Sequence, residues 1–218
     1  MMFDKLLEYT IKIINETLDP DMENKESWFE ERTLNHIDLV KRAAQKLAEY
    51  NPEFKEFDGT ELMAKVESHD QSKFEKPERE PYIELTWRHK TEGWKKSYQT
   101  PGTIGDDEIN NATLHHIKGN DHHPEYWNKE EANIDPNNRD KSVKLMDASA
   151  MPNLAIAEMV ADWVAMSEEL KTNTARQWFD KTKNVRWKFS PEQEKLIDKL
   201  LKVFEVKESK RRRKINVQ

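Results

Sequence analysis

The chain has 218 residues, enough for one good-sized hydrophobic core, and it is polar, with 35% apolar and 36% charged residues. Seven Trp, eight Phe and eight Met provide core material, which argues against disorder throughout. The absence of Cys excludes disulfides, thiolate zinc sites, iron–sulfur clusters and cysteine nucleophiles, so any metal must be bound by His, Asp or Glu. Only five Gly are present, and neither the dinucleotide-binding nor the phosphate-loop motif occurs.

Net charge and hydropathy restrict the partners. The chain carries −6 overall, and the segment 207–214 alone carries +5, which leaves −11 for the remaining residues. An acidic body argues against a broad surface for nucleic acid. Charges interrupt the N-terminal segment, which does not fit a signal peptide, and no apolar run approaches the roughly 20 residues of a membrane span. We therefore expect a cytoplasmic protein with no membrane partner; the sequence does not define an oligomeric state.

Apolar residues recur mostly at helical spacing. In chain order, helices are predicted over residues 3–18, 28–50, 60–68, 82–98, 106–118 and 153–170. The second should stop before Asn51-Pro52, Gly93 weakens the fourth, and the fifth should end near Gly119. The helix over 153–170 is the most apolar and is expected to be the central one.

Two capping boxes open the last two helices. Thr174 with Gln177 forms the first, and Ser190 with Gln193 forms the second, where Pro also occupies the first helical position. The stretches 98–105 and 130–142 are expected to be loops, and no convincing strand pair or repeat is found. The expected fold is therefore all-α, with a single helical domain of about seven or eight helices over residues 1–206 and a disordered basic tail over 207–218.

His and Asp residues are placed as a metal site would require. The stretch LHHIKGNDHHPEYW, residues 114–127, contains four of the seven His. His36 lies within a predicted helix, His69-Asp70 ends a short one, and Asp162 lies inside the most apolar one. A buried carboxylate is costly unless it is paired or binds a metal. Imidazole and carboxylate together suit Mn, Fe, Zn, Ni or Co.

This ordered set of a His, a His-Asp pair and a later Asp resembles the pattern of the HD-domain phosphohydrolase superfamily. The matching metal ligands are His36, His69, Asp70 and Asp162. The stretch HDQSK resembles the HDxGK variant with Ser72 in place of Gly, and in that subgroup the Lys, here Lys73, is implicated near the substrate phosphate. The resemblance implies an HD-domain-like helical bundle and a metal-dependent hydrolase acting on phosphate esters.

The same resemblance implies further ligands. Subgroups with HDxGK often add His residues that hold a second or third metal, and the candidates here are His116, His122 and His123, with His116 preferred to His115. Asp70 could then bridge two metals. The spacing from His116 to His122 is shorter than in the subgroup that cleaves cyclic dinucleotides, and no GYP follows, so that substrate is not carried over.

A second resemblance covers most of the chain. The segments HDQSKF, HHIKGNDHHPEYW, EMVADWVAM and RQWFDKTKNVRWKF are similar to an uncharacterised family of phage and bacterial proteins of unknown function. That family supplies no substrate. It implies that the His-rich segment, the helix with Asp162 and the Trp-rich C-terminal part belong to one fold, and that the protein works in the cytoplasm of a bacterium or a phage-infected bacterium.

The expected reaction is cleavage of a phosphate ester or anhydride by a metal-activated water, with one or two divalent transition metal ions as cofactors. The expected substrate is a small nucleotide or nucleotide-type second messenger. Asp70 and Lys73 are the expected catalytic residues, and Lys73 and Arg32 are the expected substrate contacts. An exposed salt bridge is the alternative for Arg32.

Two other functions stay open. One is an HD-type metal-dependent nuclease for single strands, anchored by the basic tail. The other is a non-catalytic helical protein that binds metal or nucleotide. The acidic body favours the phosphohydrolase over the nuclease.

Overall fold

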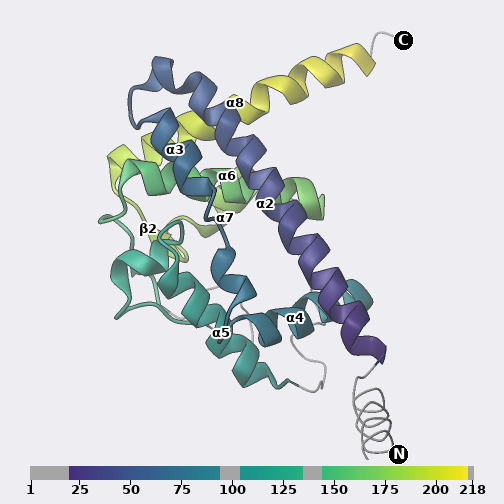
Figure 1. The fold of residues 1–218 in the computed structure, drawn as a ribbon. Coiled ribbons are helices and arrows are strands. Elements are labelled where there is room, and N and C mark those ends of the chain that lie inside the picture. Colours follow the sequence, from purple (N-terminus) through teal and green to yellow (C-terminus); the bar gives the residue numbers. More distant parts are fainter. Residues whose placement is uncertain (1–19, 94–103, 135–143, 216–218) are drawn as a thin grey trace, which may run out of the picture.

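The computed structural model describes residues 20–93, 104–134 and 144–215, and this part of the chain is mostly α-helical (Figure 1). Its elements are α2 (Pro20–Phe54), α3 (Gly59–Val66), the 3-10 helix η1 (Gln71–Phe74), α4 (Arg79–Glu92), α5 (Asp106–Gly119), the 3-10 helix η2 (Pro124–Asn128), β1 (Met146–Asp147), α6 (Asn153–Leu170), α7 (Ala175–Thr182), β2 (Trp187–Lys188) and α8 (Pro191–Ile215). The predicted helix over 3–18 lies outside the described residues. The all-α fold class is confirmed.

Helix ends follow the local chemistry in most places. Helices α5 and α6 have nearly the predicted bounds, and α4 ends at Gly93, which adopts a φ of 76° that favours glycine. Both capping boxes form: the Thr174 hydroxyl accepts from the Gln177 amide, and the Ser190 hydroxyl accepts from the Gln193 amide. Each box satisfies amide groups that have no partner within their helix.

Two helices are longer than the sequence indicates. Helix α2 continues past Pro52 to Phe54, so the expected stop before Asn51-Pro52 is wrong. Pro52 lies in the last turn, where it removes one backbone hydrogen bond shortly before the helix ends anyway. Helix α8 extends to Ile215 and so takes in most of the segment 207–218, which the sequence predicts to be disordered. Lys, Arg and Glu, which fill that segment, are good helix formers.

A short parallel pair joins β1 to β2, with Met146 opposite Trp187 and Asp147 opposite Lys188. The sequence gives no signal for it, because two residues are too few to show an alternating pattern. Buried Trp187 also stacks on Trp163 of α6, with ring centroids 5.7 Å apart. Its indole nitrogen donates to the buried carboxylate of Glu125 in η2 at 2.8 Å. The C-terminal part therefore fixes the end of the His-rich segment.

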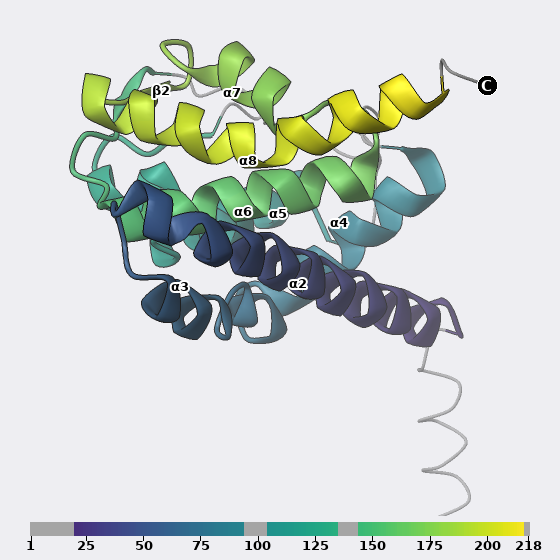
Figure 2. The same cartoon turned by 90° about the horizontal axis from the view of Figure 1, so that it is seen from above.

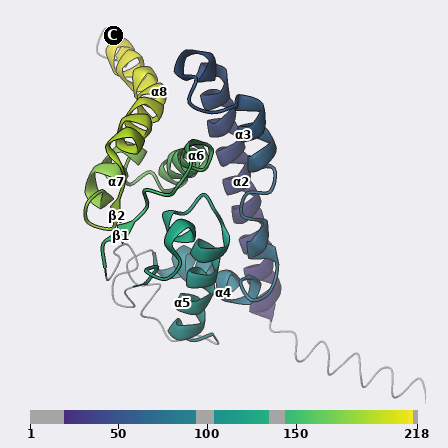
Figure 3. The same cartoon turned by 90° about the vertical axis from the view of Figure 1, so that its left-hand side faces the viewer.

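Helix α6 lies between α2 and α8 (Figures 2 and 3). It also packs against α3 and α7, and Ala155 to Ala161 are buried without interruption. A helix that is apolar on almost every side must be enclosed, so the expectation of a central helix is confirmed. Polar side chains on such a helix are then held at fixed positions inside the fold.

Replacing Ile156 of α6 with Ala should lower the free energy of unfolding by about 2–5 kcal/mol, because the side chain is fully buried and its removal leaves a cavity. Leu34→Ala on α2 is the control, since Leu34 is 57% exposed and should change stability by no more than about 0.5 kcal/mol. Urea unfolding followed by circular dichroism measures both. Equal effects would contradict the central position of α6.

Candidate metal centre

Four segments that are distant in the sequence supply the ligands predicted from it. His36 lies on α2, His116 lies near the end of α5, and Asp162 lies on α6. His69 and Asp70 follow α3, where Asp70 adopts the left-handed conformation with a φ of 59°. Asp is among the few residues other than Gly that tolerate this conformation. The turn allows two adjacent side chains to be buried together, which a continuous helix would not.

The first half of the cluster contains the four residues of the HD-like pattern. The Nε2 atom of His36 lies 3.1 Å from Asp162 Oδ1 and 3.7 Å from Asp70 Oδ2. The Nε2 atom of His69 lies 3.8 Å from Asp70 Oδ1. Ligand atoms of His36, His69 and Asp70 all lie within 4.8 Å of one another, and all three residues are buried. The structure thus brings the whole predicted set together.

The second half consists of His116, His122 and His123, whose ligand atoms also lie within 4.8 Å of one another. The Nε2 atoms of His116 and His122 lie 3.2 and 3.7 Å from Asp70 Oδ1. Asp70 therefore lies between the two groups. His115 is not part of this group; its side chain is 52% exposed, and its Nδ1 lies 2.7 Å from Glu78, whose other oxygen lies beside His116.

Several polar atoms at the centre have no hydrogen-bond partner. They are Nε2 of His69, Nε2 of His123 and Oδ1 of Asp70, and each is buried. Buried polar atoms are normally satisfied, so an exception needs a reason. Lone pairs of imidazole and carboxylate that converge at this spacing are what a divalent transition metal requires. The residues present fit such an ion.

Three Glu residues that were not predicted surround the cluster. Each lies beside the Nδ1 atom of a candidate ligand. The pairs are His69 with Glu158 at 2.9 Å, His116 with Glu78 at 2.8 Å and His36 with Glu169 at 3.4 Å. Because an ionised carboxylate only accepts hydrogen bonds, Nδ1 of the two closer rings must carry the proton. The Nε2 atoms of both rings then lie toward Asp70, and an ion held there would give the usual arrangement of a metal-bound His with an outer carboxylate.

A signal for two of these residues was present in the sequence. Glu158, Asp162 and Glu169 are spaced by four and seven residues, so they share one face of α6. A Glu in the most apolar helix, four residues before a predicted ligand, is a candidate on the same grounds as Asp162. Glu78 has no such signal, because only the tertiary fold brings this fully buried residue to His116.

Electrostatics keep the acidic ligands ionised. Burial raises the pKa of Asp70, but the Lys73 ammonium and the rings of His69 and His116 outweigh it and hold that pKa well below the usual value. Burial likewise raises the pKa of Asp162, but the hydrogen bond with His36 and the charges of His36 and His69 together hold that pKa below the usual value. Both residues can therefore offer charged oxygens to a cation at neutral pH.

The imidazoles divide into two types. Burial and the neighbouring His residues lower the pKa of His122 and His123 well below the usual value, so these rings are neutral and can bind metal at neutral pH. Burial also lowers the pKa of His36, but contacts with Asp162 and Glu169 overcome it and raise the pKa to about 9. Metal and proton therefore compete for His36.

The two predicted substrate contacts both have carboxylate partners. The Nζ atom of Lys73 lies 2.5 Å from Asp70 Oδ2. The Nε atom of Arg32 lies 2.7 Å from Glu169 Oε1, in a salt bridge that is largely shielded from solvent. Arg32 therefore forms a salt bridge, as the alternative expected, but a shielded one rather than an exposed one. Contact of either residue with a substrate stays a prediction.

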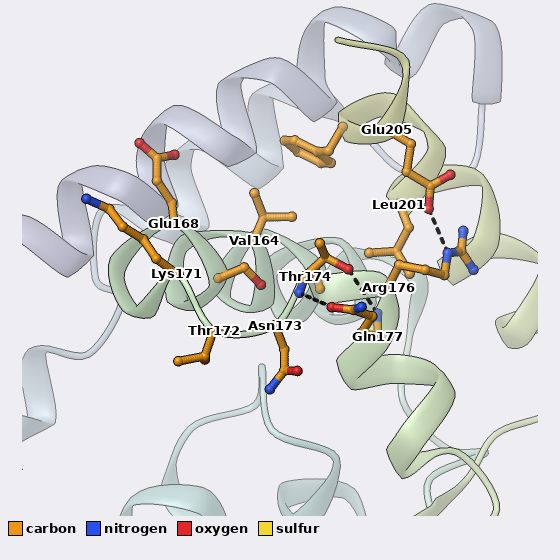
Figure 4. Close-up of a pocket in the computed structure, with 13 residues that line it drawn as sticks. Val164, Glu168, Lys171, Thr172, Asn173, Thr174, Arg176, Gln177, Leu201 and Glu205 are labelled. Carbon is orange, nitrogen blue, oxygen red and sulfur yellow. Dashed lines mark hydrogen bonds and ion pairs between the residues drawn. The ribbon is translucent and has the colours of Figure 1, made fainter. Parts of the chain in front are cut away.

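Two cavities border α6 in the described part of the chain. A small one of about 140 Å³ reaches His69, His122 and Glu158. Another of about 640 Å³ lies among α6, α7 and α8, where Figure 4 shows the contacts of Thr174 with Gln177 and of Arg176 with Glu205. None of the predicted site residues lines the larger cavity. Its α6 residues also lie on the helix face opposite Asp162, so it is separate from the metal centre.

Fold and site together define a mostly helical protein with a buried cluster of His, Asp and Glu that could hold a metal ion. The sequence profile of a family of unknown function, DUF5662, matches residues 25–203, and the chain belongs to this family. The matched range includes every residue of the cluster. No curated protein and no solved structure matches the chain. Among the described helices, none has the length and apolarity that crossing a membrane requires.

The protein should bind a divalent transition metal and be stabilised by it. At a free metal concentration about 100 times the Kd, the stabilisation should be about 2.7 kcal/mol, because the ion binds the folded cluster and not the unfolded chain. Thermal unfolding with and without Mn, Zn, Ni or Co measures this, together with elemental analysis of untagged protein. His36→Ala should weaken the effect, and Asp38→Ala at an exposed position of the same helix should not. The absence of both bound metal and any shift would exclude the metal centre.

Proposed function

We propose that the protein is a cytoplasmic metal-dependent phosphohydrolase that cleaves a phosphate ester or anhydride of a small nucleotide or nucleotide-type second messenger. Its cofactors would be one or two divalent ions of Mn, Fe, Zn, Ni or Co. The resemblance of the ligand pattern to HD-domain phosphohydrolases supports this proposal, and the geometry of the cluster agrees with it.

The position of Asp70 is the observation that carries the proposal. Its Oδ2 lies near His36 and Lys73, while its Oδ1 lies near His69, His116 and His122. A buried carboxylate that has imidazoles of both ligand groups around its two oxygens is suited to hold a pair of cations. When bound, such cations supply an activated water and neutralise phosphate charge.

The protein's own residues would bind and orient the phosphate. Lys73 lies one helical turn after Asp70, with its ammonium at the edge of the cluster and a side chain that is 17% exposed. From this position the Lys73 ammonium could donate hydrogen bonds to phosphate oxygens without moving far from Asp70. The centroid of the Tyr82 ring lies 5.2 Å from the Lys73 ammonium and 5.6 Å from the centroid of the His116 ring. This ring would limit the directions from which a substrate can approach.

A non-catalytic metal-binding protein is the second candidate, and one observation favours it. Lys73 and Arg32, the two cations proposed to hold substrate, are each paired with a carboxylate of the cluster. To bind phosphate, each cation would first have to break its ion pair with the carboxylate, and that cost would offset part of the free energy gained from the phosphate. A single-strand nuclease has less support, because the residues outside the basic tail sum to −11.

Purified protein loaded with each metal should release phosphate from at least one member of a panel of nucleoside mono-, di- and triphosphates and cyclic nucleotides. A chelator should abolish the release and added metal should restore it, because the cation supplies the activated water. Single-stranded DNA and RNA serve as the comparison substrates. If metal binds but neither nucleotides nor single strands are cleaved, the non-catalytic protein replaces the phosphohydrolase.

Lys73→Ala should lower turnover by roughly 10²–10³-fold, as the loss of a donor to a developing oxyanion does, while metal content stays unchanged. Lys73→Arg should restore only part of the rate, since a planar fork does not replace a compact ammonium. Exposed Lys76→Ala, three residues along the chain, is the matched control. Phosphate release at the wild-type rate by Lys73→Ala would show that this side chain has no role with the phosphate.

A further inference from the structure

One buried carboxylate lies against a ligand from each half of the cluster. The Oε1 atom of Glu158 lies 2.9 Å from Nδ1 of His69 and 3.6 Å from Nδ1 of His122. His69 lies in one possible ligand group with His36 and Asp70, His122 lies in another with His116 and His123, and Glu158 forms a third with these two rings. The two rings are themselves in contact, with centroids 4.3 Å apart. Glu158 therefore contacts both halves from the side opposite Asp70.

The surroundings of Glu158 keep its carboxylate in place. The residue is 2% exposed and lies on α6, whose neighbouring residues are apolar and buried. Its Oε2 atom has no hydrogen bond and lies 3.3 Å from Nζ of Lys65, which in turn contacts both oxygens of Asp121. A buried charge needs such partners, and Lys65 supplies the positive one.

We propose that Glu158 is a positioning residue that couples the two halves of the centre, by orienting His69 and His122 so that both present Nε2 to Asp70. The inference rests on the metal centre proposed above. The other two outer carboxylates contact one half each: Glu169 lies beside His36, and Glu78 lies beside His116. Glu158 alone of these three reaches a ligand in each half.

This difference has a measurable consequence. Removal of one outer carboxylate typically weakens metal binding by about 10–100-fold, because the ligand ring loses its tautomer and its orientation. Loss of Glu78 or Glu169 should weaken one metal position and spare the other. Loss of Glu158 should weaken both positions together, because one ring in each half loses its partner.

The test is a titration of the full chain with Co(II), followed by visible absorption and by calorimetry, neither of which depends on turnover. The wild type should show two binding steps. Glu158→Gln should weaken both steps by about 10–100-fold, and Glu78→Gln and Glu169→Gln should each weaken one step. Glu158→Asp keeps the charge, but its side chain is one methylene shorter, so its oxygens lie farther from His69 and His122. It should therefore also weaken both steps. It serves as the second variant if Glu158→Gln does not fold.

Other outcomes distinguish failure of the coupling role of Glu158 from failure of the metal centre itself. If Glu158→Gln or Glu158→Asp weakens a single step or neither, the coupling role is wrong and the metal centre stands. A wild type that binds only one ion would also overturn the coupling, and would leave a mononuclear phosphohydrolase. A wild type that binds no Co(II), Mn(II) or Zn(II) would remove both the centre and the inference.

Discussion

The burial of Asp70 is the constraint around which the described structure is arranged. An ionised carboxylate that is 1% exposed must be compensated, since its desolvation alone would cost several kcal/mol. The compensation comes from Lys73, three residues away, and from imidazoles on other elements. Those elements are α2, the end of α3, α5 and the turn that follows it. Each must pack correctly for the others to reach Asp70, so the fold and the ligand cluster depend on each other.

The local sequence pattern was sufficient to place helices whose apolar run or capping residues lie within the helix itself. The apolar run of α6 and the capping boxes at Thr174 and Ser190 gave correct helix positions, because propensity and capping act over four residues. The placement of Asp162 on an enclosed helix followed from the same reasoning. It predicted a buried carboxylate, and the structure brings that carboxylate to 3.1 Å from His36.

Long-range contacts explain what the sequence did not reveal. Glu78 reaches His116 across 38 positions, and Trp187 reaches Glu125 across 62, so no local window contains either pair. The order of ligands along the chain was recognisable because it resembles a known pattern. Glu158 and Glu169 were overlooked although they share the α6 face of Asp162, whereas Glu78 has no local signal because only the tertiary fold brings it to His116. The short β1–β2 pair was missed for the same reason, as strand pairing is decided by the partner rather than by two residues.

The charge balance of the cluster determines the order in which its ligands can bind. Five carboxylates surround the imidazoles, on Asp70, Glu78, Glu158, Asp162 and Glu169, and the cations in direct contact with them include Lys65, Lys73, Arg32 and His36, whose pKa is about 9. Such a site attracts cations and repels a free phosphate. If the protein is the phosphohydrolase proposed above, bound metal would add the positive charge that an anionic substrate needs, and it would be required for substrate binding as well as for the chemical step.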